Sequence, residues 1–169
     1  LKAAIAKFPK NKALQNEELN YLIRTNKVSE AIAKFEAAIA KDPTNGDYQK
    51  NLGALYGKLS DNAKDSKEKV DYFNKAEAAY KKAIALDGTN PDFQFNLGAL
   101  YYNKAKDLGD VMKNTEDNTK YAALKKQYDA ILGQAMPILE GTKTTLEGKD
   151  LKNTKYLITY KATLGALKN

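Results

Sequence analysis

The hexapeptide Asn51-Leu52-Gly53-Ala54-Leu55-Tyr56 occurs a second time, unchanged, at Asn96-Leu97-Gly98-Ala99-Leu100-Tyr101. A peptide of this length seldom recurs by chance in a chain of 169 residues. The pair therefore indicates an internal repeat, and the rest of the sequence can be read against it.

Three related turns divide the sequence. Phe8-Pro9-Lys10-Asn11 stops a helical stretch, and similar segments follow at 39–45 (Ile-Ala-Lys-Asp-Pro-Thr-Asn) and 84–90 (Ile-Ala-Leu-Asp-Gly-Thr-Asn). In each turn Pro or Gly breaks one helix, and Asn can cap the next. Between the first two turns, apolar residues at helical spacing predict one helix over about 12–25 and another over about 28–41.

This pattern resembles the tetratricopeptide repeat, a helix–turn–helix unit of about 34 residues. With the first position of the repeat at Lys12, four residues match the motif of the second helix and the following turn: Ala31, Phe35, Ala38 and Pro43. The first helix departs from the motif, with Leu19 for a small residue and Leu22 for an aromatic one. The resemblance implies an all-α, right-handed superhelical array of antiparallel helix pairs.

We expect residues 1–11 to end an upstream repeat, because the chain begins at Leu1 and not at Met. Repeats are then predicted at 12–45, 46–90 and 91–149, followed by a terminal helix at 150–169. The second and third repeats carry insertions at about 57–71 and 102–132 that should lengthen their helices, with a bend at Ser60-Asp61-Asn62. In the third repeat, Ala135, Leu139 and Thr142 match the second helix, and Pro137 should kink that helix or mark its start.

Gly53 and Gly98 lie inside predicted helices, where Gly costs about 1 kcal/mol relative to Ala. A close contact with the second helix of each pair would compensate this cost. Tyr56, Tyr80 and Tyr101 are interpreted as packing residues within or between repeats.

No motif in the sequence indicates catalysis. There is no His and no Cys, and we find no phosphate-binding glycine loop, zinc-ligand spacing or calcium loop. Thr115-Glu116-Asp117-Asn118 is typical of a turn with a helix cap. We therefore expect a protein that is not an enzyme and needs no cofactor or metal.

The resemblance implies a peptide or protein partner on the concave side of the array, which the first helix of each pair lines. Asparagine amides at such positions can donate to and accept from a peptide backbone at once. The candidate residues are Asn16, Asn20, Asp47, Lys50, Asn51, Lys58, Phe95, Asn96 and Tyr102. The alternative is that the polar residues only face water. Phe95 is either an apolar anchor for the partner or a residue that packs against the long insertion.

One subtype of the family grips the carboxylate at the C-terminus of chaperones. It requires cations at three positions, where this chain has Asn16, Asp92 and Asn96. Only the two asparagines of that subtype, Asn20 and Asn51, are present. We therefore expect no such clamp here.

The net charge of +7 leaves other functions open. The lysine-rich segment at 150–167 could bind an anionic surface or nucleic acid, and the long helices could mediate self-association; the sequence leaves the oligomeric state open. Nucleic acid is disfavoured because lysines alternate with acidic residues and Arg24 is the single arginine. No segment is long and apolar enough to predict a membrane span. The composition and extended helices resemble repeat proteins of the Bacteroides group, which favours the cell envelope over the cytoplasm.

Overall fold

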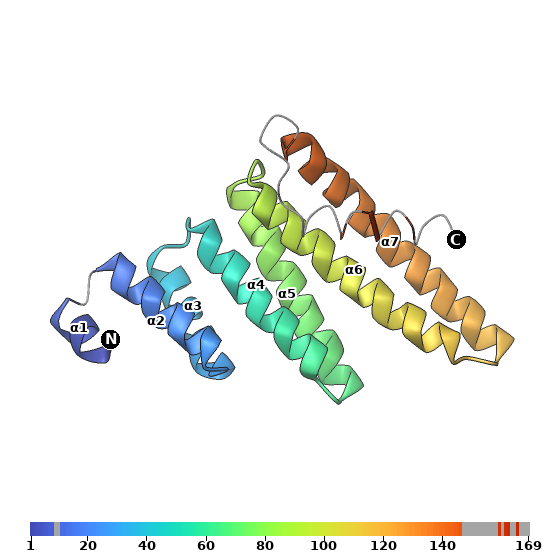
Figure 1. Ribbon diagram of the computed structural model, residues 1–169, viewed down its shortest axis with the longest axis horizontal. Helices are drawn as coiled ribbons and strands as arrows, with labels where there is room; N and C mark the ends of the chain where they lie inside the picture. Colours follow the sequence, from blue (N-terminus) through green and yellow to red (C-terminus); the bar gives the residue numbers. More distant parts are fainter. Residues whose placement is uncertain (9–10, 147–158, 160, 163–164, 166–169) are drawn as a thin grey trace. The chain divides into compact units, whose positions relative to one another are not determined.

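The computed structural model describes residues 1–8, 11–146, 159, 161, 162 and 165, and the described part contains helices and no strand. The helices are α1 (Lys2–Lys7), α2 (Lys12–Arg24), α3 (Val28–Lys41), α4 (Gly46–Asn62), α5 (Ser66–Leu86), α6 (Pro91–Lys113) and α7 (Asn118–Leu146) (Figure 1). They form two compact units, Leu1–Leu86 and Asp87–Asn169. The predicted fold class, an all-α array of helix pairs, is confirmed. The predicted terminal helix at 150–169 lies largely outside the described residues.

In unit 1 the core lies where α3 packs between α2 and α4, with α5 closing it from the other side of α4. The core residues are Leu22, Ala31, Phe35, Tyr48, Leu52, Leu55 and Ala79. The rings of Phe35 and Tyr48 lie 6.3 Å apart between centroids and join α3 to α4. Two alanines, Ala31 and Ala79, lie among these larger side chains and let neighbouring helices approach closely.

The turn between α2 and α3 forms at the predicted Asn26-Lys27. Asn26 adopts a left-handed backbone conformation with φ of 58°, which Asn tolerates better than most residues. The N–H of Lys27 donates to the carbonyl of Leu22 over 2.9 Å, so the last turn of α2 is closed by the chain that leaves it.

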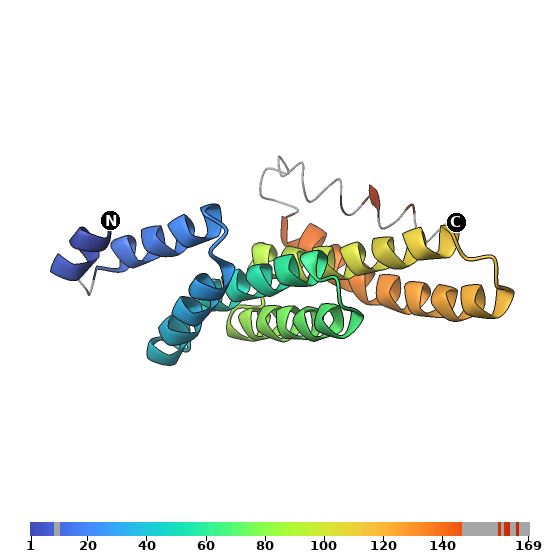
Figure 2. The same cartoon turned by 90° about the horizontal axis from the view of Figure 1, so that it is seen from below.

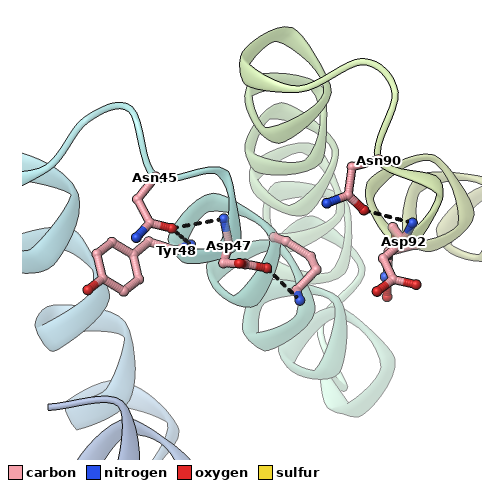
Figure 3. A network of polar contacts seen from close by, with 7 residues as sticks. Asn45, Asp47, Tyr48, Asn90 and Asp92 are labelled. Atoms are coloured by element: carbon pink, nitrogen blue, oxygen red, sulfur yellow. Dashed lines mark hydrogen bonds and ion pairs between the residues drawn. The ribbon is translucent and has the colours of Figure 1, made fainter. Parts of the chain in front are cut away.

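Asparagine side chains cap the first turns of α4 and α6 (Figure 3). The Asn45 Oδ1 accepts from the N–H groups of Asp47 at 3.1 Å and Tyr48 at 3.4 Å, and the Asn90 Oδ1 accepts from the N–H of Asp92 at 3.0 Å. Each bond satisfies an N–H that has no partner inside its helix. Asp117 caps α7 in the same way, accepting from the N–H of Lys120 over 2.7 Å, as the sequence predicted.

The insertion in the second repeat lengthens α4 and α5 to 17 and 21 residues, but the predicted bend at 60–62 is wrong. Helix α4 continues through Asn62, and the turn lies at 63–65. Ser60 is 4% exposed, and its hydroxyl donates to the carbonyl of Lys69 in α5 over 2.8 Å. This contact between the two helices gives Ser60 a role inside the hairpin. Asp65 then caps α5, accepting from the N–H groups of Lys67 and Glu68.

In unit 2 the helices α6 and α7 lie side by side as one long hairpin (Figures 1 and 2). Their lengths are 23 and 29 residues. Pro137 does not mark the start of α7, which begins at Asn118 and runs through it. The predicted packing residues Ala135, Leu139 and Thr142 are each 0% exposed. Buried apolar residues on both helices continue beyond them, so the insertion became helix and not loop.

Candidate peptide-binding surface

Helix α4 in unit 1 carries four of the nine predicted site residues. Asp47 and Lys58 are exposed there, and Lys50 and Asn51 are half-buried. Their spacing of three, four and seven residues places them along one stripe of the helix. The core residues of α4 lie on another side of the same helix, so burial of that side fixes the direction in which the polar stripe faces.

Three of the predicted charged residues already have partners. The Lys50 Nζ lies 3.0 Å from the Asp47 Oδ1, an ion pair within one turn of helix (Figure 3). The Lys58 Nζ donates to the Asn26 Oδ1 over 2.7 Å and so joins α4 to the turn after α2. Both contacts are exposed to solvent, where such pairs contribute little to stability. A ligand could therefore replace either of them at low cost.

Asn51 is the polar residue of this stripe whose side chain is available to a ligand. Its side chain makes no hydrogen bond to any described residue, although it is half-buried. Asn20 of α2 is exposed and is likewise without a side-chain hydrogen bond in the described part of the chain. The side chain of Asn16 lies outside the described part. Unit 1 thus presents two amides whose donors and acceptors face solvent.

The second copy of the hexapeptide is different, because the Asn96 Nδ2 donates to the carbonyl of Asp92 in its own helix over 2.6 Å. This bond uses one N–H of the Asn96 amide and leaves the second N–H and the amide oxygen for a ligand. Tyr102 is half-buried on α6. Phe95 is 7% exposed and offers no open apolar surface, so it does not serve as a solvent-facing anchor. Of the two roles that the sequence left open for Phe95, its burial favours packing.

A groove that the sequence did not predict lies between α3 and α5, with α4 as its floor, and we name it the α3–α5 groove. Its volume is about 400 Å³. It is lined by Glu36, Ile39, Ala40, Gln49, Leu52, Tyr56, Lys75, Ala78, Ala79 and Lys82. One repeat supplies one wall, and the next repeat supplies the floor and the other wall. No signal within a single repeat could have revealed it.

Tyr56 lies at the centre of a polar and aromatic cluster in this groove. Its hydroxyl donates to the Glu36 Oε1 over 3.0 Å, and its ring stacks on Tyr72 with centroids 6.3 Å apart and planes 20° apart. Burial, followed by the hydrogen bond to Glu36, raises the pKa of Tyr56 from 10.0 to about 12. Tyr80 is more deeply buried, and burial raises its pKa further, with a smaller contribution from Asp61. Tyr56 therefore packs between repeats, as predicted, and the other two tyrosines predicted to pack, Tyr80 and Tyr101, are fully buried.

Neither a metal site nor a membrane span is found among the described residues. No group of three or more acidic side chains there is placed to hold a metal ion. None of the described helices combines the length and apolar character that crossing a bilayer requires.

Comparisons with known proteins identify the class. Residues 73–104 match the family model described as "TPR repeat", the tetratricopeptide repeat. The structure is similar to the first TPR domain of Spaghetti (RPAP3) bound to the HSP90 peptide SRMEEVD, with a TM-score of 0.61, 18% identity and 93% of each chain covered. It is also similar to a thermophilic TPR protein of Thermus thermophilus, with a TM-score of 0.55, 14% identity, and 96% of this chain and 86% of that chain covered. No curated protein matches the sequence.

The chain thus has the fold of tetratricopeptide-repeat proteins and carries a recognisable tetratricopeptide repeat at residues 73–104. The resemblance inferred from Ala31, Phe35 and Pro43 is confirmed. The further resemblance to proteins of the Bacteroides group stays an expectation.

Proposed function

We propose that this chain is a non-enzymatic protein-interaction scaffold that binds a peptide or protein segment on the outward sides of its first helices. In unit 1 these are α2 and α4, with Asn16, Asn20, Asp47, Lys50, Asn51 and Lys58. In unit 2 the helix is α6, with Asn96 and Tyr102. The observation that carries the proposal is the half-buried Asn51 amide, which has no hydrogen bond to any described residue.

A half-buried amide without a protein partner is poorly placed to stabilise the fold. It is well placed to bind an extended peptide, because one amide can accept from a backbone N–H and donate to a backbone carbonyl. The similarity to a TPR domain bound to an HSP90 peptide supports a peptide as the ligand. Fold similarity alone does not specify a partner, so the sequence of the ligand is left to experiment.

Affinity capture from the source cells tests the proposal, with the wild-type chain beside an Asn20→Ala, Asn51→Ala double variant. Each lost hydrogen bond should weaken binding by about threefold to tenfold, so proteins that bind this surface should be strongly depleted. Asn74→Ala is the matched control, since Asn74 is an exposed asparagine on the second helix α5. Equal capture of the same proteins by wild type and double variant would exclude this surface as the site.

A further inference from the structure

The α3–α5 groove lies on a different side of α4 from the polar stripe of Asp47, Asn51 and Lys58. Its floor is formed by Gln49, Leu52 and Tyr56, at a spacing of three and four residues that follows one side of α4. Small residues form much of its rim, since Ala40 and Ala78 are exposed. The groove is therefore open along the direction of the flanking helices.

The two walls of the groove carry different charges. Lys75 and Lys82 line the α5 wall, two helical turns or about 10 Å apart along the axis. Lys82 is exposed and forms no ion pair with any described carboxylate. Lys75 lies over the rings of Tyr56 and Tyr72, at 5.8 Å and 5.6 Å from their centroids.

On the α3 wall the charged group is Glu36, whose carboxylate already accepts the hydrogen bond of the Tyr56 hydroxyl. The charged groups of the groove that remain available to a ligand are thus the two lysines of the α5 wall. The Lys75 ammonium can exchange its weak contact with Asp71, at 3.6 Å, for a ligand carboxylate without losing the aromatic rings beneath it.

We propose that the α3–α5 groove binds an amphipathic helix of a partner protein, with apolar side chains on Tyr56 and on the alanines of the rim, and carboxylates against Lys75 and Lys82. A helix fits because the alanines of the rim allow its backbone to approach, and because carboxylates seven residues apart on one helix match the separation of the two lysines. This surface is independent of the first-helix surface, so the chain would hold two partners or two segments of one partner.

A designed peptide tests the groove directly. The probe is a fluorescein-labelled helix of about 18 residues, long enough to be helical in water, with leucines along one face and glutamates along one flank. A second peptide has lysines in place of the glutamates. Fluorescence anisotropy with the full chain should show saturable binding of the glutamate peptide and at least about tenfold weaker binding of the lysine peptide.

Three variants locate the binding. Lys82→Glu turns an attraction into a repulsion and should weaken binding of the glutamate peptide by about tenfold. Ala78→Tyr fills the rim at an exposed position and should do the same while leaving the helical circular dichroism unchanged. Lys67→Glu is the control, because it makes the same change in net charge at an exposed position of α5 that lies outside the groove. It should alter the dissociation constant by less than about twofold.

Absence of saturable binding by the glutamate peptide would overturn the proposal. So would an equal loss in Lys67→Glu and Lys82→Glu, because the peptide would then be responding to the overall charge of the chain. Asn20→Ala, Asn51→Ala should bind the glutamate peptide as the wild type does, which keeps this test separate from that of the first-helix surface.

Discussion

Gly53 of α4 lies directly against the ring of Tyr80 of α5, so closely that a Cβ built on Gly53 would meet the Cδ1 and Cε1 atoms of that ring at 2.9 Å. Tyr80 is 4% exposed and held by the core, so its ring has little room to move away. The same relationship recurs in unit 2, where a Cβ on Gly98 would meet the Leu139 Cδ2 at 2.6 Å. The repeated glycine is therefore kept by contact between the two helices of a pair.

Gly53→Leu should lower the free energy of unfolding by about 1–3 kcal/mol, because the side chain has to displace the Tyr80 ring from a packed core. Urea unfolding followed by circular dichroism measures the change. Ala54→Leu, at the exposed neighbouring position, is the control and should change stability by less than about 0.5 kcal/mol.

The contact itself can be separated from the general cost of a larger side chain. In a double-mutant cycle with Tyr80→Leu, which makes room on α5, part of the cost of Gly53→Leu should be recovered. Strict additivity of the two changes would argue against direct contact as the reason for the glycine.

The features that the sequence predicted well are local ones. A run of apolar residues with helical spacing, the Asn90 cap of α6 and the glycine in a helix each carry their physical reason within a few residues. The first two are visible in the chain, and the third implied a neighbour that the structure identifies as Tyr80.

The features that were missed depend on contacts between segments far apart in the sequence. The residue type of Ser60 is typical of a bend. Its hydroxyl, however, donates to the carbonyl of Lys69 across the hairpin, and the helix continues through Ser60. For Phe95 the sequence left two roles open, an apolar anchor and a packed residue, and only the structure shows that it is buried. The contact of Lys58 with Asn26, 32 residues earlier, was not predicted either. The candidate site was thus predicted as a set of positions, but its open groups could only be recognised from the structure.

The caps of α4 and α6 allow a second test of stability. Asn45→Ala and Asn90→Ala should each cost about 1 kcal/mol, since each removes the acceptor for N–H groups of the first turn. Asn45→Asp and Asn90→Asp keep an acceptor and should retain most of the stability. If the alanine and aspartate variants unfold at the same urea concentration, the caps seen in Figure 3 contribute nothing measurable.

Stability should also depend on pH in the alkaline range. The pKa of Tyr56 is raised from 10.0 to about 12 in the folded chain, so between these values the unfolded chain loses a proton that the folded chain keeps. Unfolding then releases protons, and the free energy of unfolding falls as pH rises from 10 to 12. The stability that the protonated Tyr56 hydroxyl contributes is fully present below pH 10. Tyr80, with its pKa raised further by burial, adds to the same decline.

Tyr56→Phe should therefore make the stability less steep between pH 10 and 12, measured as the urea midpoint at several pH values. Tyr21→Phe, which replaces a tyrosine that is 42% exposed, is the control. An unchanged slope in Tyr56→Phe would mean that its hydrogen bond to Glu36 and its partial burial do not hold the proton.

The last prediction concerns the peptide SRMEEVD, which the first TPR domain of Spaghetti binds. This peptide ends in acidic residues, whereas this chain has Asn16, Asp92 and Asn96 at the positions where carboxylate-binding repeats of the family carry cations. Asp92 is exposed and should repel the peptide. We therefore expect a dissociation constant weaker than about 1 mM by titration calorimetry, which corresponds to about −4 kcal/mol of binding free energy. Asp92→Lys should strengthen binding and Asp47→Lys should not, because only Asp92 occupies one of these positions. Micromolar binding by the wild-type chain would show that other groups replace the missing cations. The prediction of which ligands this chain binds would then have to start from those groups.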